Sequence, residues 1–290
     1  MEKSFLWKDY EILATGDGLK LERWKDIYLL RPDPQVIWPQ KFDLSSYPQL
    51  HAKYTRIGGG GKWEVLKPIP DKWTISWQNL TFEIKPMGFK HTGLFPEQAV
   101  NWQKMMSLIK NRKKTQDEVK VLNLFAYTGG ATIACTSAGA MVTHVDSAKN
   151  MVEVAKRNME LSNLSDRPVR YIVDDCKKFV QREIRRNNKY DAIIMDPPSY
   201  GRGPTGEMWK IEENLFELVS LCRQLLSDNP LFFLINSYTT GLQPIVIGNI
   251  LSRALDILDE KCIQTYEVCL PTDEGISLPC GCSGMVVFDK

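Results

Sequence analysis

The sequence lacks the features that identify membrane proteins and exported proteins. No apolar stretch in its 290 residues approaches the ~18 residues that a membrane-spanning helix needs. Residues 1–10 mix charged and aromatic side chains, unlike a signal peptide. Seven cysteines, an odd number, form no disulfide framework and are typical of reduced thiols. We therefore expect a soluble cytoplasmic protein.

The sequence also lacks an excess of either charge, and its first predicted strand is not followed by a common phosphate-binding fingerprint. Its 37 Lys and Arg residues stand against 35 Asp and Glu residues, so any nucleic-acid contact would have to come from a local patch. The turn after the first predicted strand, 123-NLFAYTGGAT-132, is neither the P-loop pattern nor G-x-G-x-x-G, which disfavours a dinucleotide-dependent oxidoreductase. Cys280 and Cys282 form a single C-x-C without a second ligand pair, so we interpret both as structural and expect no metal.

The first part of the chain, residues 1–85, predicts a small antiparallel β domain. Turn residues separate its β-type segments, and six of the eight tryptophans lie here, which indicates a small core filled with large rings. The predicted strands are residues 10–16, 19–24, 26–31, 63–67 and 80–85.

Residues 86–290 predict a second domain, in which strands and helices alternate as in a parallel α/β sheet. The predicted strands are 119–126, 141–146, 168–173, 190–196, 230–236, 262–268 and 284–289; the predicted helices are 96–111, 129–139, 147–163, 175–187, 210–227 and 243–258. Only Pro- and Gly-rich residues join the last two strands. We therefore expect a seven-stranded, doubly wound, Rossmann-like sheet that ends in an antiparallel hairpin.

Candidate binding residues follow the strands, because ligands of such sheets bind outside the carboxyl ends of the strands. Gly129 and Gly130 open the helix after the first strand and allow close approach of the backbone to a ligand. Asp146 ends the second strand 17 residues after Gly129, where a carboxylate can accept hydrogen bonds from ribose hydroxyls. The alternative is that Asp146 only caps the helix that begins near Ser147.

The next two strands also end in acidic residues. After the third strand, Asp174 and Asp175 could accept a hydrogen bond from an adenine amino group or could cap the following helix. The fourth strand ends at Asp196, and Pro197 and Pro198 then fix two φ angles and remove two amide donors. This rigid loop could position a planar acceptor.

The ordered set of strand ends resembles the class I S-adenosylmethionine-dependent methyltransferases over roughly residues 90–290. More narrowly, 88-GFKHTGLFPEQAVNW-102, 123-NLFAYTGG-130 and 195-MDPPSYGRG-203 look like the branch that includes bacterial methyltransferases of large-subunit ribosomal RNA. The resemblance implies S-adenosylmethionine as cofactor and a small β domain before the catalytic one. One departure is Asn123, which stands where many members have an acid.

The resemblance also implies the roles of individual residues. The implied catalytic set is Asp196, Pro197, Pro198, Ser199 and Tyr200. The implied cofactor-binding set is Thr92, Leu94, Phe95, Gln98, Asn123, Phe125, Ala126, Tyr127, Thr128, Gly129, Asp146, Ser147, Asp175, Cys176 and Asp196.

The expected reaction is direct, in-line methyl transfer to a nucleobase, and the expected acceptor is ribosomal RNA. A covalent route to a ring carbon needs a cysteine nucleophile, but position 199 is serine and residues 235–241 contain no cysteine. The aromatic residue follows one position later, at Tyr200, so the acceptor atom stays open. Residues 200–210 combine basic and aromatic side chains and are the candidate RNA contact. A protein or small-molecule acceptor, and a catalytically silent binding module, stay open as alternatives. The sequence predicts no oligomeric state.

Overall fold

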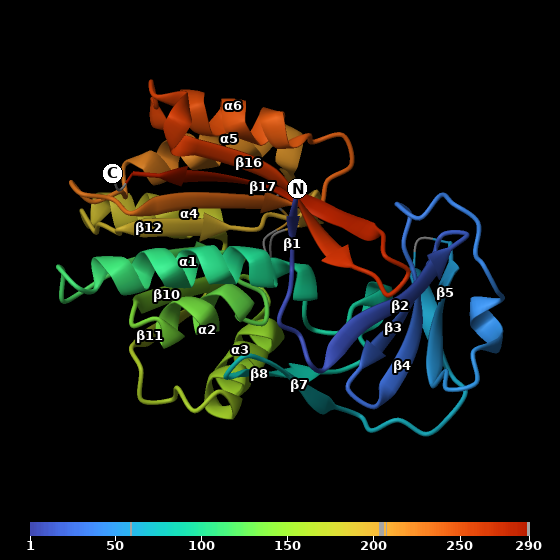
Figure 1. Cartoon of the computed structure of the whole chain (residues 1–290). Coiled ribbons are helices and arrows are strands. Elements are labelled where there is room, and N and C mark those ends of the chain that lie inside the picture. Colours follow the sequence, from blue (N-terminus) through green and yellow to red (C-terminus); the bar gives the residue numbers. More distant parts are fainter. Residues whose placement is uncertain (59, 203–205, 207, 289–290) are drawn as a thin grey trace. The chain divides into compact units, whose positions relative to one another are not determined.

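The computed structural model describes residues 1–58, 60–202, 206 and 208–288 (Figure 1). The chain divides into two compact units. One comprises residues 2–100 and 268–280, and the other comprises residue 1, residues 101–267 and residues 281–290. Within the described residues, no helix is both long and apolar enough to cross a membrane. The domain boundary expected between residues 85 and 86 stays a prediction.

The smaller unit is built around a five-stranded, mostly antiparallel sheet. Its strand order is β2-β3-β4-β5-β6, and only β4 and β5 among these neighbours are parallel. Trp24 and Trp77 are among its largest fully buried side chains, which fits a core of large rings. The elements are β1 (Glu2–Lys3), β2 (Tyr10–Gly16), β3 (Leu19–Trp24), β4 (Ile27–Pro32), η1 (Leu44–Ser46), β5 (Ala52–Ile57), β6 (Gly60–Val65), the β7 (Trp73–Trp77) and β8 (Leu80–Ile84) hairpin, η2 (Gly88–Lys90) and η3 (Pro96–Gln98).

The larger unit contains the predicted parallel sheet, in the order β16-β17-β15-β12-β9-β10-β11, and the short β1 extends it beside β16. The pairs from β15 to β11 are parallel, whereas β17 runs antiparallel to β15 and follows β16 through a short turn. The strands are β9 (Lys120–Leu124), β10 (Met141–Asp146), β11 (Val169–Val173), β12 (Ala192–Met195), β15 (Phe232–Ser237), β16 (Ile263–Pro271) and β17 (Ser277–Val287). The Rossmann-like sheet and its terminal hairpin are therefore confirmed.

Helices cover both faces of this sheet (Figure 1). Leu122, Ile193 and Phe233 on neighbouring strands are fully buried in one core cluster that also holds side chains of α4, α5 and α6. Such continuous apolar strands are expected where a sheet is covered on both faces. The helices are α1 (Ala99–Arg112), α2 (Gly130–Ser137), α3 (Lys149–Leu161), α4 (Cys176–Arg185), α5 (Ile211–Arg223) and α6 (Pro244–Leu255), with the short η4 (Glu260–Cys262) and the β13 (Tyr200–Arg202) and β14 (Met208–Lys210) hairpin.

Candidate functional site

The turn from β9 into α2 has an unusual backbone. Phe125, Tyr127 and Gly129 all have positive φ angles, of 53°, 49° and 85°. Only glycine adopts this region without steric cost, and bulky residues held there are concentrated at functional sites. The surrounding structure must therefore stabilise this turn.

Asp146 and Asn158 provide much of that stabilisation. The Oδ2 atom of Asp146 accepts a hydrogen bond from the Tyr127 amide at 2.8 Å, and its Oδ1 atom accepts one from the Ala148 amide at 2.8 Å. On the other side of the turn, the buried Asn158 side chain donates to the Thr128 carbonyl at 3.0 Å. These bonds join the turn to β10 and α3.

The two glycines of the turn lie where no larger residue fits. A Cβ atom on Gly129 would lie 2.9 Å from the Cβ atom of Ala155 on α3, and one on Gly130 would lie 2.7 Å from the Trp102 ring on α1. Gly129 is also the N-cap of α2. The first backbone amides of this helix have no acceptor within the helix, and they lie next to the glycine turn. This arrangement provides a place where a ligand can approach the backbone closely.

Asp146 keeps the capacity to bind a ligand. Burial raises the pKa of its carboxyl group, and the two backbone hydrogen bonds act in the opposite direction. Each carboxylate oxygen has a further lone pair, so both can accept a second donor. The neighbouring Ser147 is exposed, and α3 begins at Lys149 with Ala148 as its N-cap. Asp146 therefore binds the amide of the residue that caps α3, so the capping alternative is correct in part.

Asn123 faces the interior of the unit. Its side chain is 3% exposed and donates to Thr132 Oγ1 at 3.0 Å, and Thr132 Oγ1 lies 2.9 Å from His144 Nδ1. Burial lowers the pKa of His144 to about 3, so this histidine is neutral near pH 7. The asparagine thus ties α2 to two strands of the sheet. A contact between Asn123 and a cofactor stays a prediction.

Of the two acids after β11, Asp175 caps α4 and Asp174 precedes the cap. Asp175 is its N-cap and accepts from the Lys178 amide at 2.8 Å, while Asp174 accepts from the Asp175 amide at 2.9 Å and forms an ion pair with Arg182. The capping alternative therefore describes Asp175, whereas Asp174 bonds to the cap residue and pairs with a side chain of the helix. Their positions still place oxygen atoms at the end of β11, where an adenine could be bound.

The Cys176 thiol is buried beneath the turn. The Phe125 amide donates to Cys176 Sγ at 3.3 Å, and the residue is 3% exposed. Desolvation by burial raises the pKa of this thiol well above its ordinary value. The sulfur is therefore an uncharged hydrogen-bond partner of the strained turn.

The loop after β12 is held at several points. Asp196 Oδ1 accepts from the Asn236 side chain at 2.9 Å, the Pro198 carbonyl accepts from the Trp209 indole at 2.6 Å, and Ser199 Oγ lies 2.7 Å from the Thr239 hydroxyl oxygen. Pro197 is buried, whereas Ser199 is exposed. One carbonyl of the loop is thus already used by Trp209, and the serine faces solvent.

Trp209 connects this loop to the glycine turn. Its ring lies 5.1 Å from that of Phe125 with an interplanar angle of 52°. Tyr200, which pairs with Lys210 on the facing strand of the same small hairpin, is 52% exposed and available for stacking. The predicted RNA-contacting loop also includes residues 203–205 and 207, which lie outside the described residues.

A buried series of hydrogen bonds leads to Asp196 from β16, α1 and β17. Tyr266 donates to Asn101 at 2.7 Å, Asn101 donates to Ser283 at 3.0 Å, Ser283 donates to Asn236 at 2.9 Å, and Asn236 donates to Asp196. Every donor points toward the carboxylate, so the bonds polarise one another in one direction. Sequence reasoning missed all four of these partners.

The remaining predicted cofactor residues belong to the smaller unit. Thr92 and Leu94 are 1% and 5% exposed, and Phe95 packs its ring against His91 with centroids 5.6 Å apart. Gln98 ends the short helix η3 and is half-buried. Their contact with a cofactor stays a prediction.

Comparison with known proteins agrees with this architecture. Residues 50–235 match the model of the S-adenosylmethionine-dependent methyltransferase family. The chain is 31% identical over 228 residues to ribosomal RNA large subunit methyltransferase K/L of Shewanella frigidimarina, covering 77% of this chain and 29% of that protein. It is 24% identical to ribosomal RNA large subunit methyltransferase K of Neisseria meningitidis, covering 84% of this chain and 69% of that one.

The crystal structure of the S-adenosylmethionine-dependent methyltransferase from Agrobacterium tumefaciens is also similar, with a TM-score of 0.89 and 29% identity over 98% of this chain and 91% of that one. The chain belongs to the S-adenosylmethionine-dependent methyltransferase family. It spans less than a third of the length of its K/L relative.

Proposed function

We propose that the chain methylates a nucleobase of RNA, with large-subunit ribosomal RNA as the acceptor. The observation that carries this proposal is the bridge made by Trp209, which donates to the Pro198 carbonyl and packs on Phe125. It brings the acceptor loop and the glycine turn together beside an exposed aromatic residue, Tyr200. The names of the relatives in Shewanella and Neisseria support ribosomal RNA as the acceptor.

The residues of the strand ends suit the parts of S-adenosylmethionine. Asp146 would hold the ribose hydroxyls, the turn from Phe125 to Gly129 would lie against the cofactor, and Asp175 with Cys176 would flank the adenine. Asp196 would approach the amino-acid end. The cofactor supplies an already activated methyl group, so the protein has to align acceptor and donor and exclude water.

We further propose that transfer is direct, without a covalent cysteine intermediate. A cysteine nucleophile must be a thiolate. Burial raises the pKa of Cys176 well above its ordinary value, and burial together with Glu267 raises the pKa of Cys282 to about 11. The Cys282 thiol also donates to the Leu242 carbonyl at 3.0 Å. Both thiols stay protonated near pH 7, which supports in-line transfer.

The test is methylation of RNA by the purified protein. The protein is incubated with isotope-labelled S-adenosylmethionine and ribosomal RNA from cells that lack the gene, and the RNA nucleosides are then analysed by mass spectrometry. One labelled nucleoside is expected, absent with Asp196→Ala. Label in protein or in small molecules would overturn the RNA acceptor. Cofactor binding with no labelled product from any cell fraction would favour a silent binding module.

A further inference from the structure

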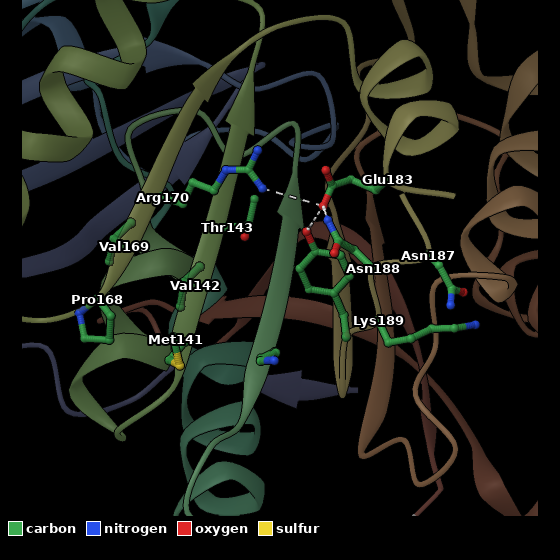
Figure 2. A pocket seen from close by; sticks show the side chains of 12 residues that line it. Met141, Val142, Thr143, Pro168, Val169, Arg170, Glu183, Asn187, Asn188 and Lys189 are labelled. Carbon is green, nitrogen blue, oxygen red and sulfur yellow. Dashed lines mark hydrogen bonds and ion pairs between the residues drawn. The ribbon is translucent and has the colours of Figure 1, made fainter. Parts of the chain in front are cut away.

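A cavity of about 620 Å³ lies at the edge of the sheet opposite to the strand ends described above. The first residues of β9, β10 and β11 and the segment after α4 line it, as Figure 2 shows. Its size is within the range of small-molecule pockets, ~300–1,000 Å³. Its polar lining includes Lys120, Thr143, Arg170, Asn187, Asn188 and Lys189.

The one carboxylate in the wall of this cavity is fully engaged by its neighbours. Glu183 accepts hydrogen bonds from Tyr190 at 2.7 Å and from Asn188 at 2.8 Å, and it lies 3.6 Å from Arg170 (Figure 2). It also accepts from Arg186 at 3.1 Å. Burial acts to raise its pKa, but these donors outweigh burial, and the pKa is lowered. Glu183 is thus an ionised part of the wall whose charge is compensated from within.

The remaining charges of the cavity are positive. Lys189 donates to the Gln224 carbonyl at 2.7 Å, which leaves its charge in place, and Lys120 is 3.9 Å from Glu118 on the surface. Because Arg170 already pairs with Glu183, Lys120 and Lys189 are the lining cations that this carboxylate does not compensate. Between them lie apolar side chains such as Met141, which can contact a base or sugar. This combination suits a ligand that carries a phosphate.

Helix α4 connects this cavity to the other edge of the sheet. It begins at the Asp175 cap, beside the proposed cofactor site, and ends near Asn187 at the cavity. Its 10 residues span roughly 15 Å. Lys178 and Arg185 are exposed along its outer surface. Two exposed cations therefore lie on the helix that runs between the two ends of the strands.

We propose that this cavity binds a phosphodiester group and the adjoining nucleotide of the RNA strand whose target base enters the methylation site. This inference rests on the proposed RNA acceptor and adds a second anchoring point to it. Lys120 and Lys189 would contact the phosphate, and the two asparagines would contact the nucleotide. Such an anchor fixes the position of the strand without reading its whole sequence.

The test compares two charge-matched double variants in binding to a single-stranded 12-nucleotide RNA, measured by fluorescence anisotropy at several salt concentrations. Lys120→Gln with Lys189→Gln should weaken binding and reduce the slope of log affinity against log salt by about 1.4, or ~0.7 for each lost phosphate contact. Lys110→Gln with Lys261→Gln removes the same charge from exposed positions on α1 and η4 and should leave the slope unchanged.

Each outcome separates this inference from the proposed function. If the unaltered protein binds the RNA and both double variants bind it equally well, the anchoring cavity is wrong and the RNA acceptor stands. If the unaltered protein binds S-adenosylmethionine but no RNA, the proposed acceptor itself fails. Uridine 5′-monophosphate and inorganic phosphate serve as further probes: binding of either at the affinity of the oligonucleotide, lost in the first variant only, would make the cavity a site for free phosphate compounds and overturn the anchor.

Discussion

Asp146 combines a structural and a binding role in one carboxylate. Its two oxygens hold the Tyr127 and Ala148 amides at 2.8 Å, and a further lone pair on each can accept a ribose hydroxyl. Because the residue is partly buried, its charge interacts strongly with any donor that reaches it. The loss of that charge should therefore weaken cofactor binding, and it should also cost stability, because an asparagine offers only one oxygen to the two amides.

Asp146→Asn should weaken S-adenosylmethionine binding by roughly 10- to 100-fold, because hydrogen bonds to a charged acceptor contribute ~1.5–3 kcal/mol. The measurement is calorimetric titration, with the melting temperature of each protein recorded alongside. Asp166→Asn is the control, since the Asp166 side chain is 79% exposed and should leave affinity unchanged. Equal affinity of Asp146→Asn and the unaltered protein would limit Asp146 to holding the turn.

At the scale of the structural element, the turn between β9 and α2 requires glycine at position 129. Gly129 is limited twice, by its φ of 85° and by the approach of Ala155 on α3. Gly241 has a similar φ of 90°, but no atom lies within 4 Å of the place where its Cβ would be. The two glycines therefore separate the cost of backbone conformation from the cost of packing.

Gly129→Ala should destabilise the protein by about 2–4 kcal/mol, about 1 kcal/mol of it from the left-handed backbone and the rest from displacing α3. Gly241→Ala should lose only the stability that comes from the backbone conformation, about 1 kcal/mol. Urea unfolding of both variants measures the difference, and S-adenosylmethionine affinity should fall in Gly129→Ala alone. Equal losses of stability in the two variants would show that the contact with Ala155 relaxes at no cost.

The sequence predicted those elements whose patterns are local. The strand at residues 141–146 and the capping Asp175 before α4 agree with the structure because apolar runs and caps depend on neighbours in the chain. Strand β5 was missed, since half of it is exposed and its apolar pattern is weak. The role of Asn123 was also open, because its partners Thr132 and His144 are set by packing of α2 on the sheet.

On the scale of the whole molecule, the series of hydrogen bonds from Tyr266 to Asp196 could not have been predicted. Asn101 is 165 residues from Tyr266 and 182 residues from Ser283 in sequence, and each is an ordinary polar residue by itself. Only the completed sheet brings them together behind the strand that ends in Asp196. The arrangement suggests that the carboxylate is oriented from β16 and β17 as well as from its own loop.

This long-range orientation can be tested by removing its first donor. Tyr266→Phe leaves Asn101 without the 2.7 Å hydrogen bond and should cost about 1–2 kcal/mol of folding stability, since a buried acceptor loses its partner. If this series of hydrogen bonds positions Asp196, kcat at saturating cofactor and RNA should also fall about 3- to 10-fold, equivalent to ~0.7–1.4 kcal/mol. Asn236→Ala, next to Asp196, should lower kcat further.

Tyr10→Phe is the matched control for this experiment. Tyr10 is also buried and donates its hydroxyl to a carboxylate, Glu22, at 2.7 Å, in the smaller unit. It should lose comparable stability while kcat stays unchanged, which separates a general loss of stability from a loss of orientation. If Tyr266→Phe lowers stability and leaves kcat at the level of the Tyr10→Phe variant, the series of hydrogen bonds from Tyr266 only supports the fold. Asp196 is then oriented by its own loop and Asn236 alone.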